Sequence, residues 1–167
     1  MNPTQLSREL RTGQSPDLTN RRWIIGLSVL GATVGQIVTT YQTGIIKHLP
    51  DPPIPIFNSD KVDASDYAYK RLDTPDGAMM VVTYGLTAWL AAAGGMNRAQ
   101  DKPWLPIALG VKTIADVATN LKLAQEEWSE NKAFCAYCQA ASVASLASVA
   151  LAVPEAVKAL RKLLGRS

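Results

Sequence analysis

The chain has 167 residues, 47% of them hydrophobic and 19% charged, and its formal net charge is +3. This size predicts one domain with a real core, and so large an apolar fraction excludes an intrinsically disordered chain. Seventeen basic residues against fourteen acidic ones are too small an excess to indicate nucleic-acid binding, so no nucleic-acid partner is expected. The mean hydropathy of +0.02 is that of an ordinary soluble protein, but the charges are very unevenly distributed.

The first 20 residues are polar and contain Pro3 and Pro16. They predict a mobile cytoplasmic lead, residues 1–20, ahead of a membrane domain over residues 21–167. No internal repeat and no linker to a second domain interrupts that domain.

Three stretches without any charged residue follow this lead, at residues 23–46, 77–96 and 133–154. A bilayer core about 30 Å thick is crossed by about 20 helical residues, so each stretch is long enough to span a membrane. A fourth window, residues 104–124, has the same length but contains Lys112, Asp116, Asn120 and Lys122. The four windows together predict an all-α fold, an integral membrane bundle of four helices.

The alternative is a soluble four-helix bundle, whose helices carry a charged face opposite the apolar one. Residues 23–46 and 77–96 have no charged face, which favours the membrane interpretation. Small residues support it, because close helix packing in lipid uses them. Gly31 and Gly35 form a GxxxG pair in the first stretch, and Ala140, Ala144 and Ser148 form a row in the last.

Basic residues predict how the four spans are oriented. They gather before the first span, between the second and third spans, and in the tail: Arg8, Arg11, Arg21, Arg22, Arg98, Lys102, Lys158, Arg161, Lys162 and Arg166. Positively charged segments stay in the cytoplasm, so both termini are expected there. The loop before the second span and the acidic loop before the fourth then face outward, on the periplasmic or lumenal side.

The only two cysteines lie in the segment Phe134-Cys135-Ala136-Tyr137-Cys138, at the outward end of the fourth span. One helical turn separates them, so their sulfurs can meet. A structural zinc site would need two more ligands, and His48 is the sole histidine, so no metal is expected. Two interpretations remain open, an inert pair that packs a helix interface and a redox-active dithiol on the disulfide-permissive side of the membrane.

The order of these features resembles the vitamin K epoxide reductase family of membrane thiol and quinone oxidoreductases. The resemblance covers about residues 23–151. Its elements are the C-x-x-C pair opening a fourth helix, a long first outer loop, and Pro75-Asp76 entering the second helix. The loop carries the stretch Ser59-Asp60-Lys61-Val62, followed by Ser65 and Tyr67.

The resemblance implies four helices around a quinone of the menaquinone, ubiquinone or plastoquinone type, which serves as substrate. It also implies that Cys138 reacts with the quinone while Cys135 exchanges disulfides. Asp76 falls where the family often has an asparagine that hydrogen-bonds a quinone carbonyl, although an ionised carboxylate cannot donate that bond. Tyr84 matches a tyrosine of the second helix, and Ser142 stands where some members have a quinone-binding tyrosine.

The first outer loop departs from the family pattern, in which it carries two shuttle cysteines. Ser59 stands in place of one and the other is missing, so a disulfide relay through this loop is impossible; Ser59 and Ser65 are left as possible loop contacts. Two functions follow as alternatives. Either a separate thioredoxin-like protein exchanges directly with Cys135, or the chain is a non-catalytic structural or quinone-binding subunit of a larger membrane complex.

Lys112, Asp116 and Asn120 recur every four residues and therefore share one face of the third predicted helix. Ionisable groups inside a membrane usually face a bundle interior, a cavity or a partner. One interpretation is a proton or quinone-headgroup contact. The slightly favoured one is a tilted or peripheral helix whose polar face meets water or a neighbouring subunit.

Overall fold

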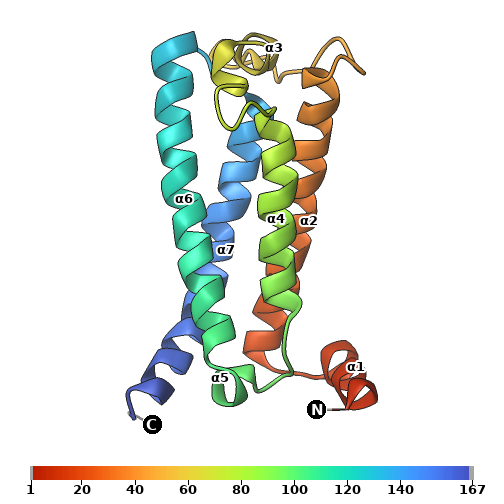
Figure 1. Cartoon of the computed structure of the whole chain (residues 1–167), viewed down its shortest axis with the longest axis vertical. Helices are drawn as coiled ribbons and strands as arrows, with labels where there is room; N and C mark the ends of the chain where they lie inside the picture. Colours follow the sequence, from red (N-terminus) through yellow and green to blue (C-terminus); the bar gives the residue numbers. More distant parts are fainter. Residues whose placement is uncertain (1, 166–167) are drawn as a thin grey trace.

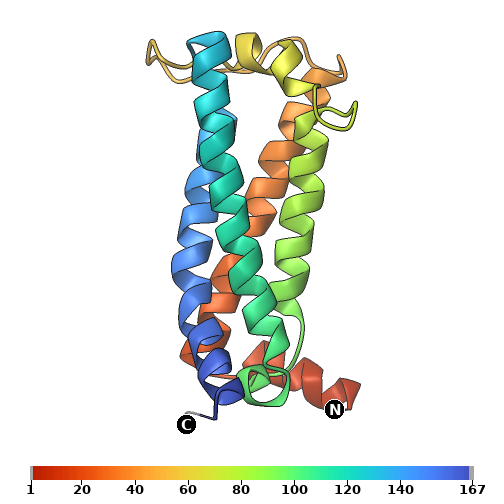
Figure 2. The same ribbon diagram turned by 60° about the vertical axis from the view of Figure 1, so that its left-hand side comes forward.

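The computed structural model describes residues 2–165, and over that range it is all-helical, with no strand. The all-α prediction is therefore confirmed. Four long helices run side by side along the molecule (Figures 1 and 2): α2 (Pro16–Gln42), α4 (Asp76–Ala92), α6 (Trp104–Asn131) and α7 (Ala136–Leu163). The shorter elements lie at the two ends: α1 (Pro3–Thr12), α3 (Ser59–Asp63), the 3-10 helix η1 (Asp66–Ala68) and α5 (Arg98–Asp101).

The four long helices do not pack equally against one another. Helix α2 packs closely along α4 and α7, and α6 packs along α7, but α4 and α6 meet over a much smaller area. The bundle is therefore looser between α4 and α6 than elsewhere, and the candidate site described below lies there.

Close packing of α2 on α4 depends on the two glycines that the sequence singles out. A Cβ atom on Gly35 would lie 2.8 Å from the Met80 Cβ, and one on Gly31 would lie 2.6 Å from the Tyr84 ring. Both distances are too short for real atoms. The GxxxG pair is thus used as expected, to bring two helices together.

Much of the N-terminal lead is helical. Residues Pro3–Thr12 form α1, and α2 already begins at Pro16. The Ser15 side chain accepts a hydrogen bond from the Leu18 N–H (3.1 Å), and Pro16 and Asp17 occupy the first turn, which is a favourable helix start. The predicted boundary after residue 20 therefore falls inside a helix.

Two helices, α2 and α7, are long and apolar enough to cross a membrane. Helix α4 has only 17 residues, and α6 carries the charged residues already noted, so four spans stay a prediction. Large apolar side chains nevertheless lie exposed on all four long helices, among them Trp23, Val29, Leu30, Val82, Leu86, Trp89, Val111, Ile114, Val143 and Leu146.

Helix α4 ends four residues before the predicted span does, because the chain turns at Gly94, whose φ is +83°. The buried Arg21 side chain occupies this end of the helix. Its guanidinium donates hydrogen bonds to five backbone carbonyls between Ala91 and Gly95, at 2.7–3.2 Å. Arg21 is therefore a buried helix cap, although the sequence marks it only as a charge at the membrane edge.

Helices α1 and α5 and the end of α7 lie at one end of the bundle, and α3, η1 and the start of α7 lie at the other (Figure 1). Arg166, one of the basic residues used to predict orientation, lies outside the described residues. The structure contains no membrane, so the side on which each end lies remains a prediction.

Candidate functional site

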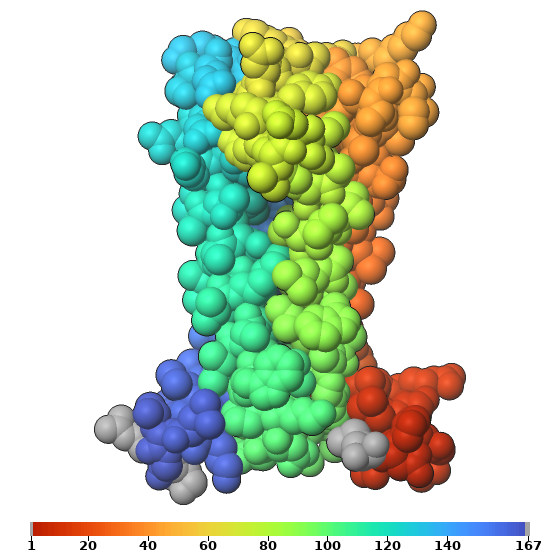
Figure 3. Space-filling view, in the orientation of Figure 1, coloured from red at the N-terminus to blue at the C-terminus, as the bar shows by residue number. Residues whose placement is uncertain are grey.

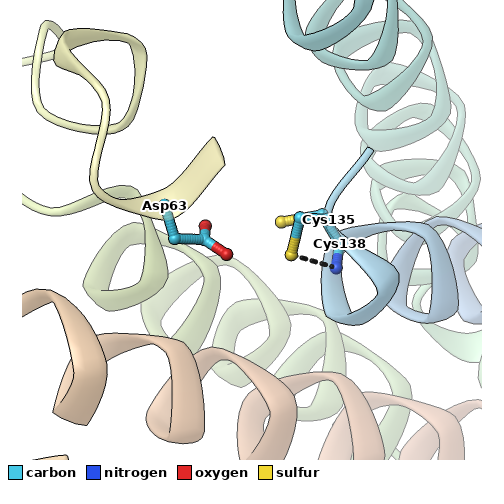
Figure 4. Close-up of side chains that lie close together, drawn as sticks. All are labelled: Asp63, Cys135 and Cys138. Carbon is cyan, nitrogen blue, oxygen red and sulfur yellow. Dashed lines mark hydrogen bonds between the residues drawn. The ribbon is translucent and has the colours of Figure 1, made fainter. Parts of the chain in front are cut away.

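The two cysteines lie at the start of α7, where Cys135 is the N-cap residue. The Cys135 Sγ accepts a hydrogen bond from the backbone N–H of Cys138 at 3.2 Å, and both thiols are free (Figure 4). The Cys135 side chain is fully buried, whereas Cys138 is half-buried. The two sulfurs thus have different surroundings in spite of being one turn apart.

The outer loop covers Cys135. Val62, Tyr67 and Ala68, from α3 and η1, pack against it in one buried cluster. A short backbone bridge fastens the loop to the residue before the cysteine: Phe134 N–H donates to the Ile56 carbonyl (2.8 Å), and Asn58 N–H donates to the Phe134 carbonyl (3.0 Å). Cys135 is therefore closed off from solvent by the loop.

Ser59 lies close to the cysteine pair, while Ser65 does not take part in the site. The Ser59 Oγ accepts a hydrogen bond from the Ala136 N–H (3.0 Å) and donates one to the Asp51 carboxylate (2.5 Å). It thereby satisfies one of the free N–H groups at the start of α7. The Ser65 hydroxyl donates to the Val62 carbonyl (2.7 Å) and stays within the loop.

A cavity of about 180 Å³ opens between α4, α6 and α7 on the other side of the pair. Cys138 lines it, together with the predicted residues Asp76, Tyr84 and Ser142. In Figure 3 a hollow below the loop, between α4 and α6, exposes part of α7. The structure thus brings four of the predicted residues to one cavity, and Cys135, Ser59 and Ser65 do not line it.

Three of the polar side chains that line the cavity form hydrogen bonds with other groups of the protein. The Tyr84 hydroxyl donates to the Ala141 carbonyl (2.5 Å) and lies 2.8 Å from the Ser145 Oγ. The Asp76 carboxylate accepts a hydrogen bond from the Gln42 amide (2.6 Å). The Ser142 hydroxyl donates to the Cys138 carbonyl (2.9 Å). Roles of these side chains toward a quinone remain predictions.

The polar face of α6 points into the bundle, contrary to the favoured expectation that it meets water or another subunit. Asp116 and Asn120 line the cavity, and the Lys112 ammonium donates to the Asp116 carboxylate (2.6 Å) and to the Thr83 carbonyl of α4 (2.9 Å). The loose contact between α4 and α6 leaves room for these groups, which explains their inward orientation.

A second, largely apolar cavity of about 170 Å³ adjoins the first. It lies between α6 and α7 and shares Asn120, Ala124, Gln139 and Ser142 with the first cavity. Leu121, Val143 and Leu146, which also line it, are exposed on the outside of the bundle. The inner cavity therefore continues toward the outer apolar surface.

Sequence reasoning missed one buried carboxylate, Asp63 of α3. One of its oxygens and both cysteine sulfurs lie within 4.8 Å of one another, and Figure 4 shows the carboxylate pointing toward the thiols. The side chain is fully buried and neither oxygen has a hydrogen-bond partner. The signal in the sequence is its spacing from Ser59, because residues four apart in a helix share a face.

Burial, together with the neighbouring carboxylates of Asp76, Glu127 and Asp51, raises the pKa of Asp63 to about 7, and the Cys135 thiol partly offsets this increase. Burial also raises the pKa of Glu127 to about 7. The Glu127 carboxylate differs in having partners, since it accepts hydrogen bonds from the Cys135 N–H (3.4 Å) and the Gln139 amide (3.1 Å). Both carboxyl groups lie next to the cysteine pair.

Asp63, Cys135 and Cys138 together supply three donors of the kind that metal ions accept. A structural zinc site uses four. A buried carboxylate beside two thiols can also take part in proton-coupled thiol chemistry, because each thiol must lose a proton before it reacts.

Comparison with protein families gives one match: a sequence model of the vitamin K epoxide reductase family matches residues 22–153. The matched range includes the outer loop, the cavity and both cysteines. Comparisons with curated proteins and with solved structures find no match.

Proposed function

Because the chain belongs to the vitamin K epoxide reductase family, we propose that it is a membrane oxidoreductase that passes electrons from thiols to a quinone through Cys135 and Cys138. The observation that carries this proposal is the position of Cys138 in the wall of the cavity between α4, α6 and α7. One thiol of the pair can therefore meet a small molecule held in the bundle, while the other stays beneath the outer loop.

The dimensions and lining of the cavity suit a quinone ring. Methionine, leucine and alanine side chains form its apolar walls, and Asn120 adds an amide that can donate to a carbonyl oxygen. For comparison, an apolar cavity of roughly 150 Å³ accepts a benzene molecule. The adjoining cavity between α6 and α7 would take the apolar tail toward lipid.

The membrane arrangement that goes with this function has four spans and both termini in the cytoplasm. Apolar side chains exposed on all four long helices support it, since a soluble bundle would place polar residues there. Both termini at one end of the bundle agree with an even number of crossings. The cysteine pair then lies at the outward, periplasmic or lumenal, end.

The proposed reaction balances as a two-electron transfer. The two thiols lose two electrons and two protons and form the Cys135–Cys138 disulfide, while the quinone gains both and becomes the hydroquinone. A partner dithiol of the thioredoxin-like class then reduces the disulfide, and its own cysteines become a disulfide. Ser59 cannot relay these electrons, so the partner must reach Cys135 directly.

A non-catalytic role in a larger membrane complex is the second candidate. The specific observation that favours it is the full burial of Cys135 beneath a loop that lacks shuttle cysteines. In that case Cys135→Ser would leave such a complex assembled and working, and the chain would co-purify with other membrane subunits.

The deciding experiment measures quinone reduction by the purified protein with a short-chain quinone and a small dithiol as electron donor. We expect turnover by the wild type and a loss to the uncatalysed rate in Cys138→Ala and Cys135→Ala. The control is Gly26→Ala, which adds a methyl group in open space on α2, far from the cysteines in sequence. Equal rates for the wild type and Cys138→Ala would rule out the proposed reaction.

A further inference from the structure

Keeping the Asp63 carboxylate ionised at this buried position costs free energy. A buried, ionised group without hydrogen bonds loses its hydration and gains nothing in return. Both Asp63 oxygens are in that position, and one of them lies within 4.8 Å of both cysteine sulfurs. Such an arrangement is stable while the carboxyl group is protonated and becomes unfavourable when it is not.

The carboxylates that face Asp63 from the surrounding elements all increase this preference for a proton. They are Asp76 at the start of α4, Glu127 near the end of α6, and Asp51 in the outer loop, whereas the neighbouring Cys135 thiol acts in the opposite direction. No basic side chain is among these groups. An extra proton in this region therefore has Asp63 as a natural acceptor.

We propose that Asp63 is the proton acceptor and donor for Cys135 during disulfide formation and reduction. The inference rests on the proposed thiol chemistry but requires no quinone. When the Cys135 sulfur attacks a Cys138 sulfur that already carries a leaving group, the new S–S bond forms and the bond to the leaving group breaks. The leaving group departs with that electron pair, and the Cys135 proton moves to the Asp63 carboxylate. On reduction of the disulfide, Asp63 returns the proton to Cys135.

Glu127 is less suited to this role, although it is also buried and acidic. Its carboxylate already accepts hydrogen bonds from the Cys135 backbone and the Gln139 side chain. Those bonds hold it toward the backbone and reduce its affinity for a proton. Asp63 has no such partner, so its lone pairs are free to take one.

The step can be observed with a chromogenic disulfide and no quinone. Reduced protein is mixed with neutral dithiodipyridine, which releases one coloured thiopyridone when it modifies Cys138 and a second when Cys135 displaces the label. Cys135→Ser identifies the first phase, because it can release only one. The rate of the second phase is then recorded from about pH 5 to about pH 9, where histidine-like and thiol groups titrate.

For the wild type we expect the second phase to speed up as pH rises, with an inflection near 7 as Asp63 loses its proton. Asp63→Asn should slow it about tenfold or more at neutral pH and move the inflection upward, beyond the ordinary thiol value of about 8.5, because burial raises the pKa of the Cys135 thiol. Asp66→Asn is the matched control, since Asp66 is an exposed acid of the same loop, and should leave the profile unchanged. Asp63→Ala gives an independent measurement should the asparagine variant lose its fold.

Two results would overturn the proposal. If Asp63 acts only as a negative charge, its removal lowers the pKa of the nearby thiol and the second phase becomes faster. If the inflection near 7 disappears in Glu127→Gln and persists in Asp63→Asn, Glu127 is the acceptor. A profile that depends on Asp63 in a protein that fails to reduce quinones would instead refute only the proposed quinone reaction.

Discussion

At the scale of single residues, buried charges at the end opposite the cysteines hold the helices together. Arg98 and Glu155 form a two-point ion pair (2.9 and 2.7 Å), and Arg98 also donates to the carbonyls of Leu90 and Ala93. Both side chains are almost completely buried. One pair therefore joins the end of α4, α5 and the last third of α7.

Removing one partner of this ion pair is expected to destabilise the folded protein strongly. Glu155→Gln leaves the Arg98 charge buried and without its counter-ion, and it should lower the free energy of unfolding by about 3–5 kcal/mol. Denaturant unfolding in detergent, followed by circular dichroism, measures this. Lys158→Gln breaks the exposed pair with Asp17 and should cost less than about 1 kcal/mol. Equal losses in the two variants would contradict the structural role of the buried pair.

At the scale of helices, the α2–α4 contact depends on Gly35. Gly35→Ala places a methyl group 2.8 Å from the Met80 Cβ, so the helices must move apart, and we expect a loss of about 1–3 kcal/mol in stability. Gly26→Ala is the matched control on the same helix, because its new Cβ meets nothing within 4 Å. That change should be neutral or stabilising by up to about 1 kcal/mol. Similar thermal midpoints for the two variants would argue against tight packing at Gly35.

The gap between α6 and α7 gives a second prediction at this scale. Val143 lines the outer cavity but not the inner one. Val143→Trp should therefore obstruct the path of an isoprenoid tail and raise KM for a long-chain quinone severalfold, with little change for a tail-less one. Val82→Trp, an exposed apolar position on α4 outside both cavities, is the control. An equal rise in KM for both quinones would place the tail elsewhere.

At the scale of the whole molecule, the raised pKa of Asp63 links folding to pH. The folded protein holds the Asp63 proton up to about pH 7, whereas the unfolded chain releases it near the ordinary value of 3.8. The resulting stabilisation is complete below that ordinary value and is lost as pH rises toward and through about 7. The loss is on the order of 4 kcal/mol for this group.

The thermal midpoint should accordingly fall between about pH 5 and about pH 8, and the fall should be smaller in Asp63→Asn. At pH 8 the asparagine variant should be more stable than the wild type. Differential scanning calorimetry or circular dichroism in detergent tests both statements. If the two proteins show parallel midpoints across this range, Asp63 does not change its protonation on unfolding.

Much of the helical framework could be predicted from the sequence because charge-free stretches of membrane length are a strong signal. The cysteine pair is evident from the sequence itself, whereas the three predicted residues that share the cavity with Cys138 follow from a resemblance in the order of motifs. The inward orientation of the polar face of α6 is harder to predict, because the spacing of Lys112, Asp116 and Asn120 identifies a common face but not the neighbour that this face meets.

Asp63 could not be assigned from the sequence because its environment is built by distant segments. Asp51 from the first part of the loop, the start of α4, the end of α6 and the start of α7 all surround it, and each is distant from it along the chain. The helices within the lead are hard to predict for a different reason. Ser15 and Pro16 are helix-start signals, but they lie in a polar, proline-containing segment.

The backbone bridge between Phe57 and Phe134 has a consequence for how the site exchanges with its surroundings. The bridge contributes two of the hydrogen bonds that hold the loop over Cys135, and the loop has no cysteine through which it could be locked covalently. Hydrogen bonds break and re-form by thermal motion alone, so opening of this cover follows temperature and denaturant rather than redox state. Access to Cys135 thus depends on the equilibrium between the closed and the open loop. The bridge contributes to that equilibrium equally in the dithiol and disulfide forms.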